Sequence, residues 1–221
     1  MLNVAHATPI DPEIENLLLK AERTDHLIKS IVKQIELMIL QPDPISRIVN
    51  NVSQFVDPGA VELKGKKNLS ILGDLLLQYG DLMAHDTPQY SSLSGMSSAF
   101  KLMDQKWAEV SAEVSIRVIA ELKKISHVEY ANIVKSKSEL LTTRVDMDYY
   151  KNQFYNGSSD PEVQVKCAEL TSSFEVQSAK LKELLIDFCG ELTETKVATC
   201  LEKMIDLLKE AHGHFQKILS F

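Results

Sequence analysis

Apolar residues recur along this chain at steps of three and four, which places them on one face of an α-helix. Over the first forty or so residues, this spacing is broken only at the polar pair Thr24-Asp25. Asp11-Pro12 is a favourable start for the helix, because Asp caps helix N-termini and Pro fits the first helical position. The stepped residues are Ile14, Leu17, Ala21, Ile28, Ile31, Ile35 and Met38.

Proline and glycine divide the pattern into three long segments. We predict helix 1 at about 12–56, with a bend at Pro42 and Pro44, followed by the loop DPGAVELKGKK. Helix 2 is predicted at about 68–155, with a break near 86–95, where Pro88, Gly95 and several serines occur. Helix 3 is predicted at about 160–220, capped by Asp160 with Pro161 behind it.

The third segment keeps close to a seven-residue apolar period, which is typical of left-handed coiled-coil packing. At about 1.5 Å per residue it would span roughly 90 Å, whereas a compact domain of this size is nearer to roughly 40 Å across. We therefore expect an all-α antiparallel bundle of rod form that dimerises to cover its remaining apolar surface. The residues predicted for the core or dimer face are Ile28, Ile35, Phe174, Leu181, Phe188, Leu201, Leu208 and Phe215.

Charge and composition argue against some classes of function. The chain of 221 residues has 24 basic and 31 acidic residues and a net charge of −7, which argues against general nucleic-acid binding. Its three cysteines have no close pairing in sequence, which fits a reducing cytoplasm. No stretch approaches the about 18 apolar residues of a membrane span, so any membrane association is expected to be peripheral.

Motifs of catalysis are not found in the sequence. It contains no H-E-x-x-H, no G-x-S-x-G and no Walker loop. Asp146 and Asp148 are two positions apart, on different faces of a helix, and His212 and His214 also point apart. We predict no enzyme activity, no metal and no cofactor.

Several stretches resemble the endophilin branch of the BAR-domain family. Residues 40–47 (LQPDPISR) are similar to the LQPNPxxR that closes the first part of endophilin helix one. Residues 143–151 (TRVDMDYYK) resemble the family's RRLDFDYKK near the end of helix two. Residues 70–83 (SILGDLLLQYGDLM) and 210–219 (EAHGHFQKIL) are weaker matches. With the helix layout, the likeness extends over nearly the whole chain.

The resemblance implies one BAR domain over 1–221, in which three long kinked helices per chain build a crescent-shaped dimer with a six-helix core. It further implies curvature sensing or scaffolding of membranes in endocytosis or membrane trafficking. We expect this chain to lack the endophilins' N-terminal amphipathic helix and their C-terminal Src-homology-3 domain. The basic residues that follow the DFDY-like motif in the family are also reduced here to Lys151.

Membrane contact therefore depends on scattered basic residues and on the hairpin tip. At the tip, Phe154 and Tyr155 either insert into a membrane interface or close the end of the core. The basic residues either attract anionic phospholipid or pair with neighbouring acids on the helix surface. The candidates are Lys64, Lys66, Lys67, Lys135, Lys137, Arg144, Lys151 and Lys166.

Two other functions remain open from the sequence. One is a dimeric protein-interaction scaffold with weak direct lipid binding, which possesses the same fold and heterodimerises with a related BAR protein. The acidic balance favours it. The other is an unrelated helical scaffold such as a spectrin-like rod, which a monomeric state would favour.

Overall fold

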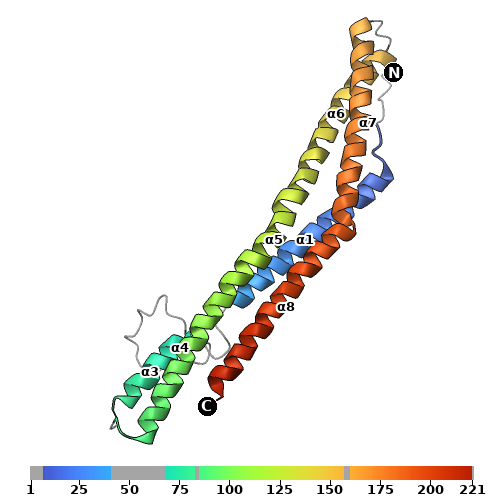
Figure 1. The fold of residues 1–221 in the computed structure, drawn as a ribbon. Coiled ribbons are helices and arrows are strands. Elements are labelled where there is room, and N and C mark those ends of the chain that lie inside the picture. Colours follow the sequence, from blue (N-terminus) through green and yellow to red (C-terminus); the bar gives the residue numbers. More distant parts are fainter. Residues whose placement is uncertain (1–6, 41–67, 83–84, 157–159, 221) are drawn as a thin grey trace. The chain divides into compact units, whose positions relative to one another are not determined.

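The structure is a computed structural model, and it describes residues 7–40, 68–82, 85–156 and 160–220. Within these ranges all regular structure is helical, which confirms the all-α bundle (Figure 1). Two compact units are formed, one by Met1–Val32 with Glu121–Thr199 and the other by Lys33–Ala120 with Cys200–Phe221. The predicted continuation of helix 1 through 41–56, and the loop that follows it, lie outside the described residues.

The helices follow the apolar segments of the sequence. Helix α1 covers Pro12–Leu40, and α3 covers Asn68–Gly80. The next helical elements in chain order are α4 (Pro88–Val114), η1 (Ser115–Ile119), α5 (Ala120–Lys124), η2 (Ile125–Tyr130) and α6 (Ala131–Tyr155). The last two helices are α7 (Pro161–Cys189) and α8 (Glu191–Leu219).

The break in helix 2 lies earlier than the predicted 86–95. Turn residues occupy 81–82 and 85–87, and helix α4 begins at Pro88, so residues 88–95 are helical. The physical reason is that Pro88 stands at the first helical position, where its missing N–H costs nothing. Thr87 caps the helix by accepting a hydrogen bond from the Tyr90 amide at 3.2 Å. Here proline starts a helix rather than ending one.

The predicted helix 3 is interrupted at Gly190, which separates α7 from α8. A Cβ at Gly190 would lie 2.8 Å from the Ile186 carbonyl oxygen, so only glycine fits there. The Lys20 ammonium of α1 donates to the Cys189 carbonyl at 2.8 Å and so satisfies a free acceptor at the end of α7. An ammonium group at a helix C-terminus also complements the helix dipole.

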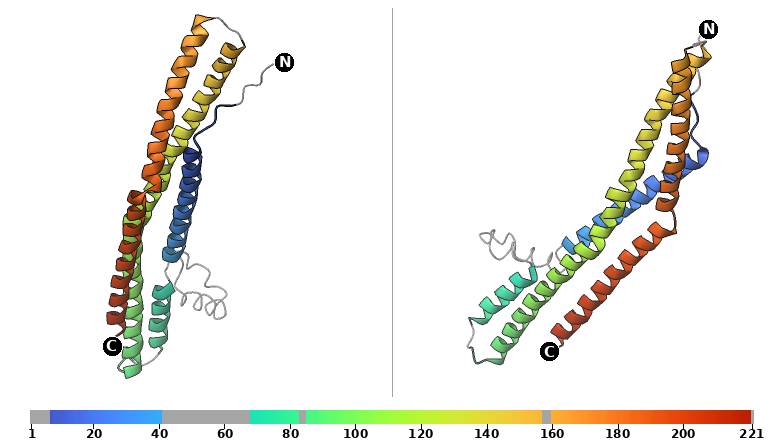
Figure 2. Two further views of the ribbon diagram at one scale, coloured as in Figure 1. Left: turned by 90° about the vertical axis from the view of Figure 1, so that its right-hand side faces the viewer. Right: turned by 45° about the horizontal axis from the view of Figure 1, so that its top comes forward.

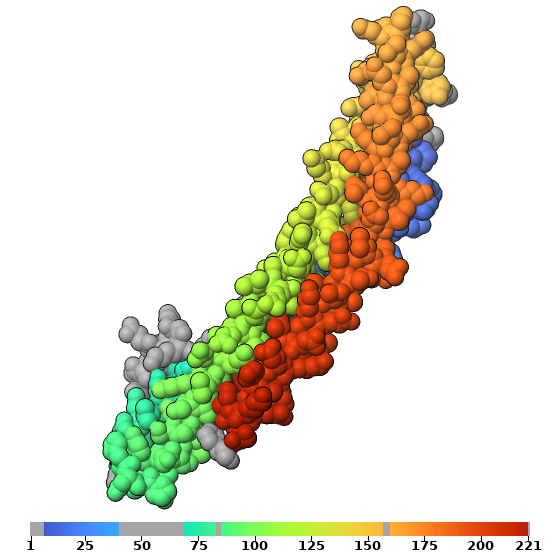
Figure 3. All heavy atoms as spheres, in the orientation of Figure 1, coloured from blue at the N-terminus to red at the C-terminus, as the bar shows by residue number. Residues whose placement is uncertain are grey.

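In the first unit, α6 and α7 pack against each other as an antiparallel hairpin (Figures 2 and 3). Their contact is made by apolar residues at heptad spacing, among them Ile133, Leu140 and Met147 on α6 and Leu181, Leu185 and Phe188 on α7. All six are at most 3% exposed. Asp160 caps α7 by accepting from the Glu162 amide, as predicted from the sequence.

The polar gap at Thr24-Asp25 is a buried hydrogen-bonding site. Asp25 is 5% exposed and accepts a short hydrogen bond from the Ser126 hydroxyl, which lies in the π-helical turn η2. The Lys29 ammonium donates to the same carboxylate at 2.7 Å and lies over the Tyr130 ring. Burial, then the Asp25 carboxylate, raises the pKa of Tyr130. The cluster fixes one register of α1 against η2, because another register would leave Asp25 buried without donors.

In the second unit, α3 packs closely on α4 (Figure 2). The carboxylate of Asp104 in α4 accepts from both the Ser70 amide and the Ser70 hydroxyl, and Lys101 pairs with Asp74 at 2.8 Å. Gly73 permits this approach, because a Cβ there would lie 2.8 Å from the Ser97 carbonyl oxygen. The close crossing of the two helices therefore requires a glycine.

We predict that Gly73→Ala destabilises the protein by about 1–2 kcal/mol, although alanine is the better helix former, because overpacking outweighs propensity. The matched control is Gly213→Ala in α8, where nothing lies within 4 Å of the added Cβ. That variant should gain about 0.5–1 kcal/mol. Urea unfolding at one protein concentration measures both, and equal shifts for the two variants would refute the close approach at Gly73.

Candidate membrane-contact surface and dimer face

The predicted basic residues divide into two groups on the α6–α7 hairpin. Lys137, Arg144 and Lys151 recur every seven residues, so they form a single row along α6. None of the three forms an ion pair with a residue that the structure describes. We call these three residues the basic row.

The remaining described candidates are neutralised by neighbours. Lys135 lies 3.9 Å from Glu139, and Lys166 lies 3.1 Å from Glu169. Both are surface pairs on their own helix, so each lysine contributes little net charge. Lys64, Lys66 and Lys67 lie outside the described residues.

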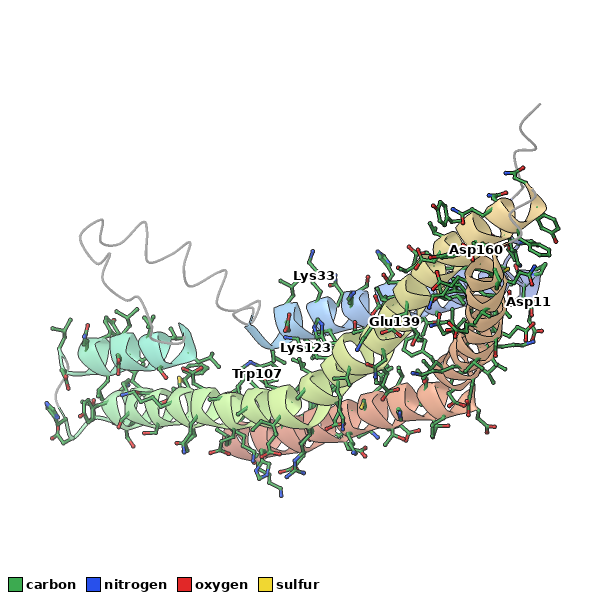
Figure 4. The ribbon with its side chains drawn as sticks, turned by 90° about the horizontal axis from the view of Figure 1, so that it is seen from above. Asp11, Lys33, Trp107, Lys123, Glu139 and Asp160 are labelled. Carbon is green, nitrogen blue, oxygen red and sulfur yellow. The ribbon has the colours of Figure 1, made fainter. Side chains whose placement is uncertain are left out.

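Acidic residues occupy the other flank of α6. Glu139 and Asp146 are also seven residues apart, and each directly precedes a buried core residue. Because Glu139 is two positions from Lys137, the two side chains point to sides of the helix about 160° apart. Figure 4 marks Glu139 on α6 and Asp160 at the start of α7. The hairpin thus presents an acidic flank and a flank that holds the basic row, on which Asp148 also lies, between Arg144 and Lys151.

A groove of about 720 Å³ lies on the acidic side, between α6 and α7. Its lining includes Ser136, Glu139, Glu169, Ser173, Gln177 and Lys180. The Gln177 side-chain oxygen is buried and has no hydrogen-bond partner among the described residues. No group of His, Cys, Asp or Glu in the described part of the chain could hold a metal ion. Acidic, basic and apolar side chains share this groove, since Lys180 and Val176 line it together with the two glutamates.

The tip of the hairpin carries exposed aromatic side chains. Phe154 is 44% exposed and Tyr155 is 76% exposed, and their rings meet edge to face with centroids 5.9 Å apart. Tyr149, one turn earlier, is also exposed and stacks edge-on with Tyr150. Aromatic side chains with a polar group suit the boundary between water and lipid.

The predicted core and dimer residues behave as two sets. Ile28, Ile35, Leu181 and Phe188 are buried, whereas Phe174, Leu201, Leu208 and Phe215 keep intermediate exposure. Three residues of the second set lie on α8. In the part of α8 that belongs to the second unit, residues 200–219, the buried residues are Cys200 and Ala211.

Helices α8 and α4 make few contacts, and the side chains in these contacts stay partly exposed to solvent. The Phe215 ring lies 6.4 Å from the Trp107 ring, centroid to centroid, and Lys106 lies 3.6 Å from Glu210 (Trp107 is labelled in Figure 4). Next to them, Ile205 and Leu219 are about half exposed. Helix α8 therefore has an apolar stripe that the second unit covers only in part.

Sequence reasoning missed three of the features described above. These are the Lys20 contact with α7, the buried Asp25–Ser126 pair and the π-helical turns. The only signal was the polar gap at Thr24-Asp25 in an otherwise apolar stripe. A polar residue at a core position is a recognised sign of a register-setting contact.

The fold and sequence together define the class of this protein. A family model for the BAR domain matches residues 1–219, and the chain therefore belongs to the BAR-domain family. Among curated relatives it is 26% identical to endophilin-B1 of Gallus gallus and of Homo sapiens, over 95% of this chain. It is 24% identical to endophilin-A3 of Mus musculus over 98% of this chain. The resemblance to endophilins is thus confirmed.

The chain spans 61–62% of the length of these endophilins. Among solved structures, it is similar to the amphiphysin BAR domain from Drosophila, with a TM-score of 0.69 and 13% identity, covering 99% of this chain and 93% of that one. A BAR protein from Galdieria sulphuraria matches with a TM-score of 0.59 and 12% identity, over 96% and 97% of the two chains. These structures support the fold. No helix in the described ranges is long and apolar enough to cross a membrane.

Proposed function

We propose that this chain is a non-catalytic, peripheral membrane-curvature module that acts as a crescent-shaped homodimer with a six-helix core in endocytosis or membrane trafficking. Its place in the BAR family, beside endophilins and amphiphysin, supports the membrane-curvature part of this proposal. The single observation that carries direct lipid contact is the basic row, which lies on one flank of α6 without ion-pair partners among the described residues.

The basic row contacts anionic phospholipid headgroups. A basic residue near an anionic surface contributes about 1 kcal/mol, and charges add when they lie on one face. Lys137, Arg144 and Lys151 satisfy this condition, whereas Lys135 and Lys166 are already paired with acids. The acidic flank with Glu139 and Asp146 is turned away from the lipid in this arrangement.

We predict that K137Q/R144Q lowers affinity for anionic liposomes about 30-fold at low salt, from two lost attractions of about 1 kcal/mol each. The matched control is K135Q/K166Q, which removes the same formal charge from paired positions and should change affinity less than about threefold. Co-sedimentation with phosphatidylserine vesicles at several salt concentrations measures both. Equal losses for the two double variants would show that only net charge matters.

The aromatic tip adds a contact that salt does not screen. Phe154 and Tyr155 are exposed in the described hairpin, and this favours insertion over closure of the core. Burying such side chains in an interface is an apolar contribution, which persists when salt weakens the electrostatic part.

We predict that F154S/Y155S removes most of the liposome binding that survives at high salt and leaves the salt-dependent part in place. Tyr79→Ser in α3 is the control, because Tyr79 is 57% exposed but lies in the other unit. Co-sedimentation at high salt provides the measurement. If the tip variant and the control bind alike, the tip does not insert.

The homodimer covers the apolar stripe of α8. The partly exposed Leu201, Leu208 and Phe215 lie on this stripe, and a second copy would bury them. Apolar burial is the main driving force for such association. The alternative, heterodimerisation with a related and more basic BAR chain, agrees with the net charge of −7 and with the acidic flank of α6.

We predict that Leu208→Lys converts a dimer of 24.8 kDa chains into monomers at micromolar concentration. Lys209→Ala is the control, because Lys209 is exposed and pairs with Asp206 on the surface of the same helix. Analytical ultracentrifugation gives the masses. A monomeric wild-type chain that becomes dimeric only on mixing with a related BAR chain would favour the alternative, and a monomer under both conditions would contradict both forms.

A further inference from the structure

The N-terminal segment that leads into α1 is fastened to α6 at one point. The Thr8 amide donates to both carboxylate oxygens of Asp148, at 3.1 and 3.3 Å, and the Thr8 hydroxyl donates to the same group at 2.5 Å. The Lys151 ammonium lies 3.5 Å from the Thr8 hydroxyl oxygen. These residues are 140 and 143 positions apart in sequence, so the contact is a tertiary one.

Asp148 belongs to the DMD motif, which membrane binding does not explain. In this motif Met147 is fully buried in the hairpin core and Asp146 is exposed on the acidic flank. Asp148 is the position that holds the N-terminal segment. We call its contact with Thr8 the Thr8 latch.

Thr8 is followed by Pro9 in a segment at 7–11 that has no regular secondary structure. A threonine before proline, in extended backbone, is the substrate pattern of proline-directed protein kinases, and proline itself favours extended backbone at the preceding residue. Thr8 is partly exposed, so a brief opening of the latch presents its hydroxyl.

We propose that Thr8 is a phosphorylation site whose modification opens the Thr8 latch. A proline-directed kinase would supply the phosphoryl group from a nucleoside triphosphate. The Thr8 oxygen forms a bond to the γ-phosphorus, the bond from that phosphorus to the bridging oxygen breaks, and the hydroxyl proton leaves to the kinase base. The hydroxyl hydrogen bond to Asp148 is then lost, and the Thr8 amide is the one donor of Thr8 that still faces this carboxylate.

Electrostatic repulsion decides whether phosphorylation opens or tightens the Thr8 latch. A phosphate brings a charge of about −1.5 to −2 into contact with the Asp148 carboxylate, and like charges at this distance repel. Among the residues that the structure describes, Lys151 is the cation in contact with Thr8, and a single ammonium is outweighed by the combined negative charge. The segment therefore separates from α6.

The chain contains a second Thr-Pro pair, Thr87-Pro88, with the opposite environment. The Thr87 hydroxyl oxygen accepts from the Tyr90 amide at the N-terminus of α4. Negative charge is favoured at a helix N-terminus, so a phosphate or carboxylate there is accommodated. The two sites share a motif but differ in whether the hydroxyl faces a carboxylate or amide donors.

The test is hydrogen exchange followed by mass spectrometry on the full chain. Thr8→Glu, and Thr8 phosphorylated by a proline-directed kinase with Mg-ATP, should speed exchange at the Thr8 amide by about tenfold or more, as expected when a charged hydrogen bond is lost. Thr87→Glu is the matched control and should leave residues 7–11 unchanged.

The rate of Thr8 phosphorylation provides a second test of the latch, in a variant that changes Asp148 instead of Thr8. Asp148→Asn weakens the latch and should raise the rate of Thr8 phosphorylation without changing that of Thr87. The proposal is overturned if Thr8→Glu exchanges like wild type, if it gains protection through Lys151, or if the kinase leaves Thr8 unmodified while it modifies a Thr8-Pro9 peptide. None of these measurements requires a membrane, so their outcome is independent of the proposed lipid contact.

Discussion

The heptad row of buried side chains along α6 is the constraint on which the rest of the hairpin depends. Ile133, Leu140 and Met147 must face α7 for the two helices to exclude water between them. Once that row is placed, helix geometry determines the direction of every other side chain on α6. The basic row and the acidic flank follow from it, as does the position of Asp148 toward the N-terminal segment. A change of helix phase would mix the two flanks.

The helical content and the all-α class could be predicted because they depend on local spacing. Helix starts at Pro12 and Pro161 were predicted for the same reason, since an Asp cap and a proline are neighbours in sequence. Pro88 was misjudged, because a proline marks a helix start or a helix end depending on the cap before it. The break at Gly190 depends partly on Lys20, 169 residues away, and no local pattern contains that contact.

The candidate membrane-contact residues also divide into features that local sequence predicts and features that require the fold. The sequence named the basic residues but did not say which were neutralised. Lys135 and Lys166 have acids three or four positions away, so their pairing was readable in principle. The partners of Lys182 are Asp11 and Glu13 on another segment, at 3.6 and 2.5 Å, and these require the fold. The hydrogen bond to Glu13, and then the charges of Glu13 and Asp11, raise the pKa of Lys182. Lysine counts alone therefore overstate the surface available to lipid.

The role of a carboxylate in this protein depends on its burial and on the groups next to it. Asp25 occupies a core position, yet it is satisfied by Ser126 and Lys29, and so specifies one alignment of α1. Asp148 lies outside the core and holds a segment by charge-assisted hydrogen bonds, which a single added charge can reverse. A buried carboxylate surrounded by donors resists change, because opening it would expose a whole interface. A partly exposed one can be opened locally, and for that reason the Thr8 latch, rather than the Asp25 cluster, suits regulation.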